Sequence, residues 1–337
     1  MFATLAGGYP ATDPGSPPDR PVDELVRAVL AEQAEAGLAL LTDGSVRWPD
    51  PLEAIGRMLL RPDRAGHRRD GPLTVDAWTF AADAADGVPV KQCLPGPYSL
   101  GRRFAEGEAV RADLTRAFAD ALAVELVDLA AAGCPFIQVD EPAAVSIGSD
   151  PGEQTLFREA QARLLDGLGP TEARPHLSLA ITGGNADLAG GATIFAAPYD
   201  SHLFDLIAGP DNWRLVTVAP AERGIVLGVA DARSPVVDER EVIVWAVGYG
   251  AASRGRGEAR IGIAPSDSMV GLPRAAARAK IDRLGEIVRL VDRRAEEPIA
   301  AALDPRAVDL RSSALGGWTP RGARYPRRVR APRRSRR

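Results

Sequence analysis

Short apolar segments alternate with longer amphipathic segments along most of the chain, and this alternation limits the fold more than any other feature of the sequence. Apolar segments typical of buried strands lie at residues 2–6, 38–42, 88–94, 135–140, 176–181, 192–196, 224–229 and 260–264. Segments with helical spacing of apolar residues lie at 22–36, 51–60, 110–132, 153–168, 202–207, 237–247 and 273–290. A helix between two strands returns the chain to the same end of the sheet, so we expect the strands to run parallel.

This pattern predicts an α/β fold, a (β/α)8 TIM barrel, which needs about 250 residues. The alternative is a doubly wound open sheet, but no Gly-x-Gly-x-x-Gly follows the first strand. We expect a single barrel at residues 1–295 and a C-terminal extension at 296–337. An exposed loop is expected at 61–72, followed by a hairpin-like segment at 73–80.

Four of the predicted strands are preceded by a glycine, at Gly37, Gly87, Gly133 and Gly224. Glycine commonly ends a helix in the left-handed backbone conformation, which other residues adopt at a cost. We therefore expect these residues to be left-handed helix stops.

The positive charge is concentrated at one end of the chain. Residues 321–337 contain nine arginines and no acidic residue, and removing them from a net charge of −4 leaves a body near −13. The extension is predicted to be a disordered, solvated appendage. Nucleic acid is an unlikely partner, because the acidic body would repel phosphates.

Several features favour a cytoplasmic protein that does not enter membranes. No apolar run reaches the ~20 residues that a membrane-spanning helix needs. The first residues lack the basic start and apolar run of a signal peptide. The two cysteines, Cys93 and Cys134, lie in apolar segments and are predicted to be buried free thiols. The sequence does not indicate an oligomeric state.

The segment Phe136–Ala143 reads as a buried strand that stops abruptly at Asp140, Glu141 and Pro142. Proline ends the strand because it has no N–H to donate. Barrel enzymes keep their active sites at the carboxyl ends of their strands. We therefore expect Asp140 to lie in a functional site.

This segment resembles the "QIDEPA" strand of the cobalamin-independent methionine synthase family. Further similarities to family motifs are found in order over roughly residues 2–290: Leu5–Pro10 to "T-I-G-S-F-P", Thr42–Ser45 to "T-D-G-E", Lys91–Pro97 to "K-G-M-L-T-G-P", and Gly228–Pro235 to "G-V-x-D-x-x-S-P". The resemblance implies a methyltransferase barrel of the methionine synthase and uroporphyrinogen decarboxylase type. It also implies a role in methionine biosynthesis, with a small-molecule substrate.

The family binds zinc through a His-x-Cys after the fifth strand, a Glu at the sixth and a Cys after the eighth. By this resemblance, His176-Leu177-Ser178 has lost the cysteine, and the predicted sixth strand at Thr193–Ala197 carries no carboxylate. The eighth strand leads into Ser266-Asp267-Ser268 where the family reads "P-D-C". A serine hydroxyl is a poor replacement for a thiolate as a zinc ligand. We expect a divergent member without zinc, in which His176 is the only retained ligand; Asp200, His202 and Asp267 are the alternative metal-binding residues.

Family enzymes hold the amino group of homocysteine with the Glu of "D-G-E" and the Asp of "I-D-E-P". The corresponding residues here are Ser45 and Asp140. The folate-stacking tryptophan corresponds to Arg103, and the histidine of "D-I-H-S-P" to Arg233. The predicted catalytic residues are Asp140 and His176. The predicted substrate-binding residues are Asp43, Ser45, Gln92, Tyr98, Glu141, Ser178, Asp231 and Ser268.

Structural roles are the alternative for several of these residues. Asp43 and Asp231 could cap the helices that follow them. Glu141 could form an ion pair with Arg47 or Lys91, and His176 could be a satisfied core residue.

Three functions remain open from the sequence. The first is methyl transfer to homocysteine or an altered acceptor, with a donor of methyltetrahydrofolate or methylcobalamin type and no bound cofactor. The second is a metal-independent decarboxylase on the same barrel, which would bind an acidic substrate through arginines at the predicted mouth: Arg47, Arg102, Arg103 and Arg233. The third is a ligand-binding paralogue without catalysis.

Overall fold

Seven parallel strands form one curved sheet in the order β1-β7-β6-β5-β4-β3-β2. The computed structural model describes residues 1–18, 20–60, 71–169 and 174–296, with side chains up to residue 292. The strands are β1 (Phe2–Ala3), β2 (Gln92–Pro95), β3 (Phe136–Asp140), β4 (His176–Ile181), β5 (Ser201–Asp205), β6 (Gly224–Ala230) and β7 (Ile261–Pro265).

The predicted strand at 38–42 joins the two edges of this sheet. Parallel bridges connect Thr4 to Leu40 and Leu41 to Val90. The N–H of Leu41 donates to the carbonyl of Pro89 at 2.9 Å, and the N–H of Lys91 donates back to Leu41 at 2.9 Å. The segment therefore closes the sheet into a ring, and the predicted barrel is confirmed. Because this segment carries no strand label, β2 is the third strand of the barrel and β7 the eighth.

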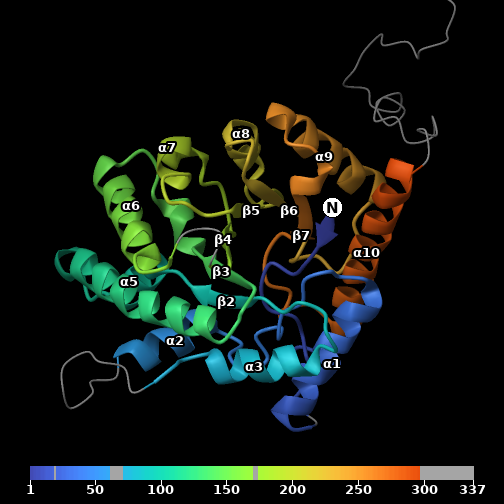
Figure 1. The fold of residues 1–337 in the computed structure, drawn as a ribbon, viewed down its shortest axis with the longest axis horizontal. Helices are drawn as coiled ribbons and strands as arrows, with labels where there is room; N and C mark the ends of the chain where they lie inside the picture. Colours follow the sequence, from blue (N-terminus) through green and yellow to red (C-terminus); the bar gives the residue numbers. More distant parts are fainter. Residues whose placement is uncertain (19, 61–70, 170–173, 297–337) are drawn as a thin grey trace, which may run out of the picture. The chain divides into compact units, whose positions relative to one another are not determined.

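The helices form a layer outside the strands (Figure 1). They are α1 (Val22–Ala36), α2 (Pro51–Leu60), α3 (Val75–Ala84), α4 (Pro97–Phe104), α5 (Glu108–Ala131), α6 (Pro151–Leu165), α7 (Gly191–Ile194), α8 (Trp213–Val218), α9 (Arg240–Ala252) and α10 (Arg274–Glu296). Short 3-10 turns are η1 (Pro142–Ser146), η3 (Asp187–Ala189), η4 (Pro210–Asn212), η5 (Ser253–Gly255) and η6 (Glu258–Arg260). None of the helices in the described ranges is long and apolar enough to cross a membrane.

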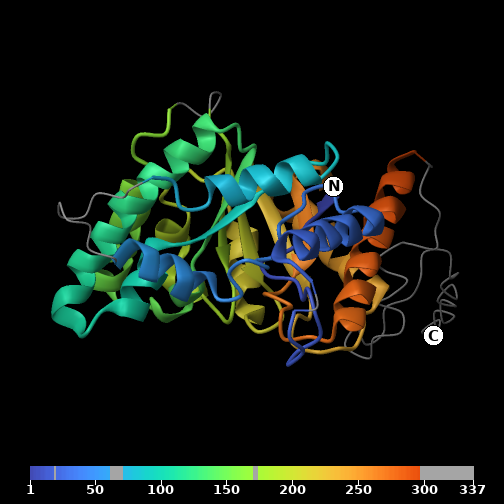
Figure 2. The ribbon, with the colours of Figure 1, turned by 90° about the horizontal axis from the view of Figure 1, so that it is seen from below.

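The first and last of these helices, α1 and α10, lie side by side (Figures 1 and 2). The Arg274 guanidinium pairs with Glu32 at 2.6 Å, and Arg278 pairs with Glu35 at 3.0 Å. The helix layer therefore closes at the same place as the sheet, where β1 pairs with β7.

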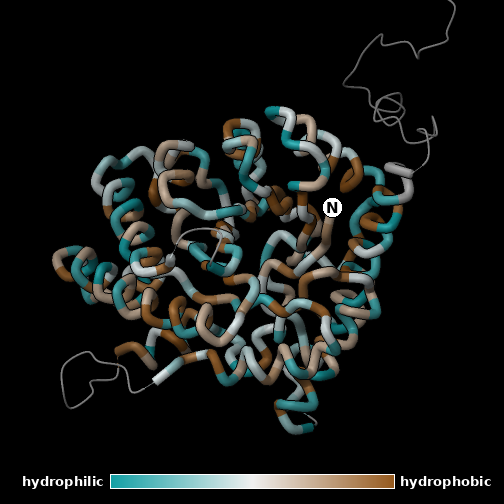
Figure 3. Tube along the Cα trace, in the orientation of Figure 1, coloured by the Kyte–Doolittle hydropathy of each residue, from teal (hydrophilic) through white to brown (hydrophobic). Residues whose placement is uncertain are grey.

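The core has two layers because successive side chains of a strand point to opposite faces. A small inner cluster lies within the barrel and consists of Ala6, Ala180, Leu203, Val226 and Ala264. The larger apolar cluster lies between the strands and the helices. Hydrophilic residues recur along the outer helices α6 and α10 in Figure 3. Cys93 and Cys134 are free thiols, as predicted, but only Cys134 is fully buried and Cys93 is partly exposed.

Three local predictions are wrong. The sixth strand is β5 at Ser201–Asp205, where a helix was predicted, and the predicted strand at 192–196 overlaps helix α7. His202 disguises the strand in the sequence, but its ring is buried against the edge of Phe195 with 4.8 Å between centroids. The predicted hairpin at 73–80 is instead the start of α3, whose first turn is fixed by hydrogen bonds from Leu73 and Thr74 to the Glu125 carboxylate.

The glycine predictions hold at three of four positions. Gly37, Gly87 and Gly133 have φ values of 90°, 84° and 88°. Gly224 does not have a positive φ and begins strand β6. It is constrained by space instead, because an added Cβ would lie 3.0 Å from the Cβ of Ser201.

By its contacts, Met1–Asp292 forms one compact unit. The predicted loop at 61–72, except for its last two residues, and the predicted extension at 296–337, except for its first, lie outside the described residues.

Candidate active site

A cavity of about 330 Å³ opens at the carboxyl ends of the strands, and we call it the mouth cavity. Its polar lining consists of Ser45, Asp50, Asp140, Thr182, Asp267 and Ser268. Three of these are carboxylates, and neither arginine nor lysine belongs to the lining within the described part of the chain. The cavity is therefore an acidic one.

Asp140 ends β3 and is held by a chain of hydrogen bonds through the barrel interior. Lys91 Nζ donates to Gln138 Oε1 at 2.6 Å, and Gln138 Nε2 donates to Asp140 Oδ1 at 2.6 Å. The same Nε2 also donates to the carbonyl of Ala6, at 2.6 Å. This chain fixes one carboxyl oxygen of Asp140 and orients the group at the cavity.

Electrostatics make Asp140 unusual for an aspartate. Burial raises the pKa of its carboxyl to about 7, although Gln138 and Lys91 oppose the rise. Burial also lowers the pKa of Lys91, whose Nζ donates to Gln138 and to the carbonyl of Leu5. In the ranges that the structure covers, Asp140 forms no ion pair. The carboxyl can therefore gain or lose a proton near neutral pH.

Glu141 has a structural role that the sequence did not reveal. Its fully buried carboxylate accepts hydrogen bonds from the N–H groups of Tyr98 and Ser99, the Ser99 hydroxyl and the Gln161 amide. It therefore satisfies the free N–H groups at the start of α4. Burial raises the pKa of Glu141 to about 7. The predicted ion pair with Arg47 or Lys91 is not formed.

Tyr98 is also turned away from the mouth cavity. Its buried side chain donates from Oη to Glu153 at 2.5 Å, and Arg102 Nε donates to the same oxygen at 3.0 Å. Neither Tyr98 nor Glu141 lines the cavity, so their predicted contact with a substrate has no geometric support.

Ser45 and Ser268 do line the mouth cavity, whereas Asp43 and Asp231 beside it hold turns. Asp43 Oδ1 accepts the N–H of Ser45 at 2.8 Å, and Asp231 Oδ1 accepts the N–H of Arg233 at 2.9 Å. Burial raises the pKa of Asp43. Both aspartates thus have a structural role in a turn, but neither caps a helix, because the helices that follow begin only at Pro51 and Arg240.

His176 lies at the wrong end of the barrel for the predicted catalytic role. It is the first residue of β4, and Asp140 pairs with Ala180 on that strand. His176 and Ala180 are four residues apart on this strand, so His176 and Asp140 lie about 13 Å apart along the strand direction. His176 therefore cannot share a reacting group with Asp140, and it does not line the mouth cavity.

Ser178 and Gln92 are likewise not at the mouth. Ser178 is buried in the middle of β4, and its hydroxyl has no hydrogen-bond partner among the described residues. Gln92 pairs in register with Ile137, and its amide donates to the adjacent carbonyl of Cys93 at 2.9 Å. Both residues were predicted to bind the substrate at the carboxyl ends of their strands, but β2 ends only at Pro95 and β4 only at Ile181.

The resemblance implies zinc ligands at the ends of the fifth, sixth and eighth strands, and the structure shows where these strands end. The fifth strand, β4, ends in Ala180-Ile181 and continues into Thr182. The sixth, β5, ends in Asp205, so the expectation that this strand offers no carboxylate is wrong. The eighth, β7, leads into Asp267.

An arginine joins these two carboxylates. The Arg233 guanidinium donates to Asp205 at 3.2 Å and to Asp267 at 2.9 Å. Asp205 is fully buried and also accepts the N–H groups of Ile207 and Ala208, both at 2.9 Å. A fixed cation therefore lies between the residues that would have to approach a metal.

These residues do not fit a zinc site of the family type. Zinc prefers thiolate and imidazole ligands, and no His or Cys of the described residues lines the mouth cavity. No group of three or more His, Cys, Asp or Glu side chains suited to a metal occurs in the described ranges. The alternative metal-binding set is not assembled, because Asp200 pairs with Arg174 and His202 is buried among aromatic rings.

The arginines proposed to bind an acidic substrate are all occupied. Arg47 pairs with Asp23, Arg102 with Glu153, and Arg103 with Glu53. None of the four, including Arg233, lines the mouth cavity.

Sequence reasoning missed Asp205 as a residue at a strand end, and it did not choose Thr182, which follows β4 and lines the mouth cavity, as a site residue. The sequence of Ser201–Asp205 did carry a signal for Asp205. Leu203 points into the barrel core, and Ser201 and Asp205, two residues before and after it, lie on the same side of the strand. A strand with that alternation has its inward carboxylate at its end.

Together these features define a (β/α)8-barrel protein with an acidic candidate site at the carboxyl ends of its strands. Residues 51–156 match a family model described as "Cobalamin-independent synthase, Catalytic domain". The resemblance inferred from the sequence motifs is thus confirmed.

Individual relatives agree with this match. The chain is 32% identical over 143 residues to a 5-methyltetrahydropteroyltriglutamate–homocysteine methyltransferase of Salinibacter ruber, an alignment that covers 36% of this chain and 18% of the relative. The chain therefore spans less than a fifth of the length of that relative.

Two solved structures show the same fold. A B12-independent methionine synthase from Shewanella, in complex with selenomethionine, has a TM-score of 0.72 at 17% identity, covering 86% of this chain and 98% of its own. A structure described as a vitamin-B12-independent methionine synthase from Listeria monocytogenes has a TM-score of 0.61 at 18% identity, covering 87% of this chain and 98% of its own.

Proposed function

We propose that this protein transfers a methyl group to a small amine-bearing acceptor, held at Asp140 in the mouth cavity, without zinc. The relatives' names describe methyl transfer to homocysteine, which supports this class of reaction. The donor that we propose is of methyltetrahydrofolate type, with one of methylcobalamin type as the alternative, and we propose that no cofactor is bound permanently.

The observation that carries the proposal is the Asp140 carboxyl in an acidic cavity without a cation of its own. A cavity of about 330 Å³ is at the small end of the range for ligand sites. Taking a carboxylate out of water is costly unless a partner arrives. An ammonium group of an amino-acid-like acceptor would be that partner, and Asp267 and Asp50 on the same walls add to the attraction.

Without zinc, the acceptor has to be activated by a base. An ordinary thiol has a pKa near 8.5, so only a few per cent is thiolate at neutral pH. Asp140, whose pKa is about 7 in the free protein, is suited to take the thiol proton on the oxygen that Gln138 does not bind, and Asp50 and Asp267 then remain to hold the ammonium group. The sulfur then attacks the methyl carbon and the carbon–nitrogen bond of the donor breaks. Its electron pair stays on the nitrogen, which takes up a proton.

Arg233 would support this site indirectly. Its ion pair with Asp267 at 2.9 Å holds one wall of the mouth cavity in place. The same guanidinium neutralises part of the negative charge near the acceptor and so reduces the repulsion among the three carboxylates of the cavity walls.

The first test is ligand binding by titration calorimetry with L-homocysteine at pH 8, using wild type, Asp140→Asn and the matched control Asp231→Asn. Asp140→Asn should lose measurable binding, whereas Asp231→Asn should keep it, because Asp231 holds a turn and does not line the cavity. Equal affinity of all three proteins would overturn the role of Asp140.

The second test is product formation. The protein is incubated with EDTA, homocysteine and 5-methyltetrahydrofolate in its mono- and triglutamate forms, and methionine is measured by mass spectrometry. We expect the wild type to form methionine in the presence of EDTA and Asp140→Asn to form none. Turnover only after added zinc would contradict the metal-free mechanism, and binding without any turnover would favour the ligand-binding paralogue.

A further inference from the structure

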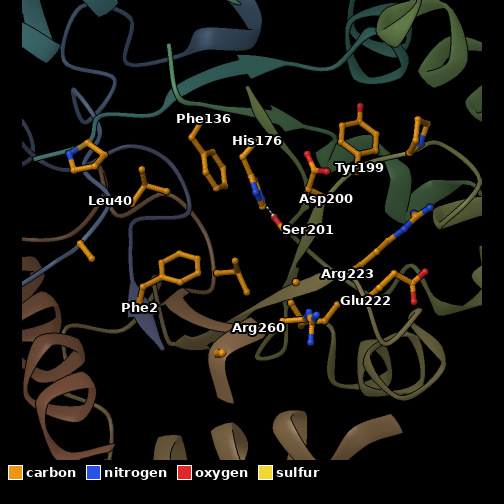
Figure 4. A pocket seen from close by; sticks show the side chains of 17 residues that line it. Phe2, Leu40, Phe136, His176, Tyr199, Asp200, Ser201, Glu222, Arg223 and Arg260 are labelled. Carbon is orange, nitrogen blue, oxygen red and sulfur yellow. Dashed lines mark hydrogen bonds between the residues drawn. The ribbon is translucent and has the colours of Figure 1, made fainter. Parts of the chain in front are cut away.

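A second and larger cavity, of about 680 Å³, opens at the amino-terminal end of the barrel (Figure 4). We call it the basal cavity. Its lining includes the first residues of three neighbouring strands, His176 of β4, Ser201 of β5 and Gly224 of β6. It therefore lies at the opposite end of the strands from Asp140 and shares no lining residue with the mouth cavity.

The amino-acid sequence explains why this end of the barrel is hollow. Barrel interiors are usually filled by bulky branched side chains in layers. Here β5 and β6 begin with Ser201 and Gly224, which fill little space. The ring of Phe2 lies over Gly262, where an added Cβ would be 2.7 Å from the ring, so no side chain from β7 fills this layer either.

The basal cavity has an apolar half and a polar half, with His176 between them. Phe2, Leu40 and Phe136 lie on one side in Figure 4, and Ser201, Arg223 and Arg260 lie on the other. The His176 ring stacks on Phe136 with 4.3 Å between centroids and 19° between planes. Its Nε2 is 2.8 Å from the Ser201 hydroxyl. Burial lowers the pKa of His176, so this imidazole is neutral at pH 7.

The polar half carries a surplus of positive charge. Asp200 is already engaged by Arg174 at 2.7 Å and by the N–H of Leu177 at 2.8 Å. Arg223 donates to the carbonyls of Phe195 and Ala197.

Across the described residues, neither Arg223 nor the exposed Arg260 forms an ion pair, and Glu222 is the remaining acid of the lining. Two guanidinium groups thus face one unpaired carboxylate.

We propose that the basal cavity is a second ligand site, which binds a flat aromatic or heteroaromatic molecule carrying one negative charge. The ring would lie against the aromatic walls, where offset and edge contacts between rings are favourable. The anionic group would reach Arg260, and a polar atom of the ring would meet His176 or Ser201. The volume lies within the range of small-molecule sites, which are mostly apolar with a few placed polar groups.

Three probes of the same size and different charge test this: 1-naphthoate, 2-naphthol and 1-naphthylmethylamine, which are anionic, neutral and cationic at pH 7. We expect saturable binding of one naphthoate per chain by titration calorimetry, weaker binding of the naphthol, and still weaker binding of the amine. No saturable binding of any probe, or tightest binding of the amine, would overturn the proposal.

Two variants test whether the probes bind in the basal cavity. Arg260→Gln should weaken naphthoate about fivefold, as expected for an exposed ion pair, and leave naphthol unchanged. Arg254→Gln, which alters another exposed arginine outside the lining, is its control. Ala259→Trp should block all three probes by filling the cavity, whereas Ala34→Trp on the exposed face of α1 should not. If the Arg260 and Ala259 variants bind like their controls, the probes bind elsewhere and the proposal is wrong.

The same probes separate this site from the proposed methyl-transfer site. Asp140→Asn should bind naphthoate like wild type, because its carboxyl lies about 13 Å along the strands from His176. A loss of naphthoate binding in Asp140→Asn would mean that the probes occupy the mouth cavity, and the proposal would fail while the proposed function would stand.

Discussion

Replacing Asp140 by asparagine should make the protein more stable at alkaline pH than the wild type. The carboxyl has a pKa of about 7 when folded, against 3.8 as its ordinary value. Between these values the folded chain keeps a proton that the unfolded chain has released. Stability therefore falls as pH rises through this interval and stays constant above it.

The size of the effect follows from the two pKa values. One pKa unit corresponds to about 1.4 kcal/mol, so the wild type should lose up to roughly 4 kcal/mol between pH 4 and pH 7 through Asp140. Asparagine does not titrate, and its carbonyl oxygen can still accept the hydrogen bond from Gln138. The variant should therefore match the wild type near pH 4.5 and exceed it at pH 8 by about 2–4 kcal/mol.

The assay is urea unfolding of both proteins at pH 4.5, 6, 7 and 8, analysed as the difference in free energy of unfolding at each pH. Glu141, whose pKa is also raised to about 7, is present in both proteins, so its own titration cancels to first order in the difference. Asp231→Asn, which removes a carboxylate that holds a turn outside the mouth cavity, is the matched control for the substitution itself. A difference between wild type and Asp140→Asn that stays flat across the series would refute the assignment of a raised pKa to Asp140.

Three further substitutions test the supporting structure. Gly96→Ala should destabilise the protein by about 1–3 kcal/mol in urea unfolding, because the new Cβ would lie 2.2 Å from the carboxyl carbon of Glu141; Gly169→Ala, which meets no atom within 4 Å, should be near neutral. Arg233→Gln should cost about 2 kcal/mol by leaving buried Asp205 without its cation, and Arg233→Lys should cost less; equal losses for Gln and Lys would show that charge is not the cause. Trp78→Phe removes the 3.0 Å hydrogen bond from Nε1 to the carbonyl of Val90 and should lower stability by about 1 kcal/mol, and an unchanged urea midpoint would contradict this.

The sequence was sufficient to place Asp140, because the apolar residues Phe136, Ile137 and Val139 indicate a buried strand and a proline ends it. The sequence was insufficient for β5, because its first residues, Ser201 and His202, are polar although they are buried. The misplacement of His176 has a related cause. A His-x-Ser pattern matches a His-x-Cys motif in spacing, but spacing alone does not say at which end of the strand it lies.

The contact of Arg233 with Asp205 and Asp267 was also beyond sequence reasoning. The partners are separated by 28 and 34 residues and come from three different strand ends. These loops meet because β5 pairs with β6 and β6 pairs with β7, so the three strand ends are neighbours in the sheet. Local patterns predict which residues follow each strand, whereas the contacts between their side chains depend on the register in which the strands pair.

The contacts that close the barrel have a consequence for how the chain folds as it is synthesised. β1 pairs with β7 between Phe2 and Gly262, and Arg274 reaches Glu32 across 242 residues of sequence. Until the ribosome has released that far segment, β1 remains an open strand edge with unpaired N–H and C=O groups. Open edges favour pairing between chains, and closure of such long loops is slow. We therefore expect nascent chains that stop before β7 to aggregate or bind chaperones, and chains that extend through α10 to become protease-resistant in a single late step.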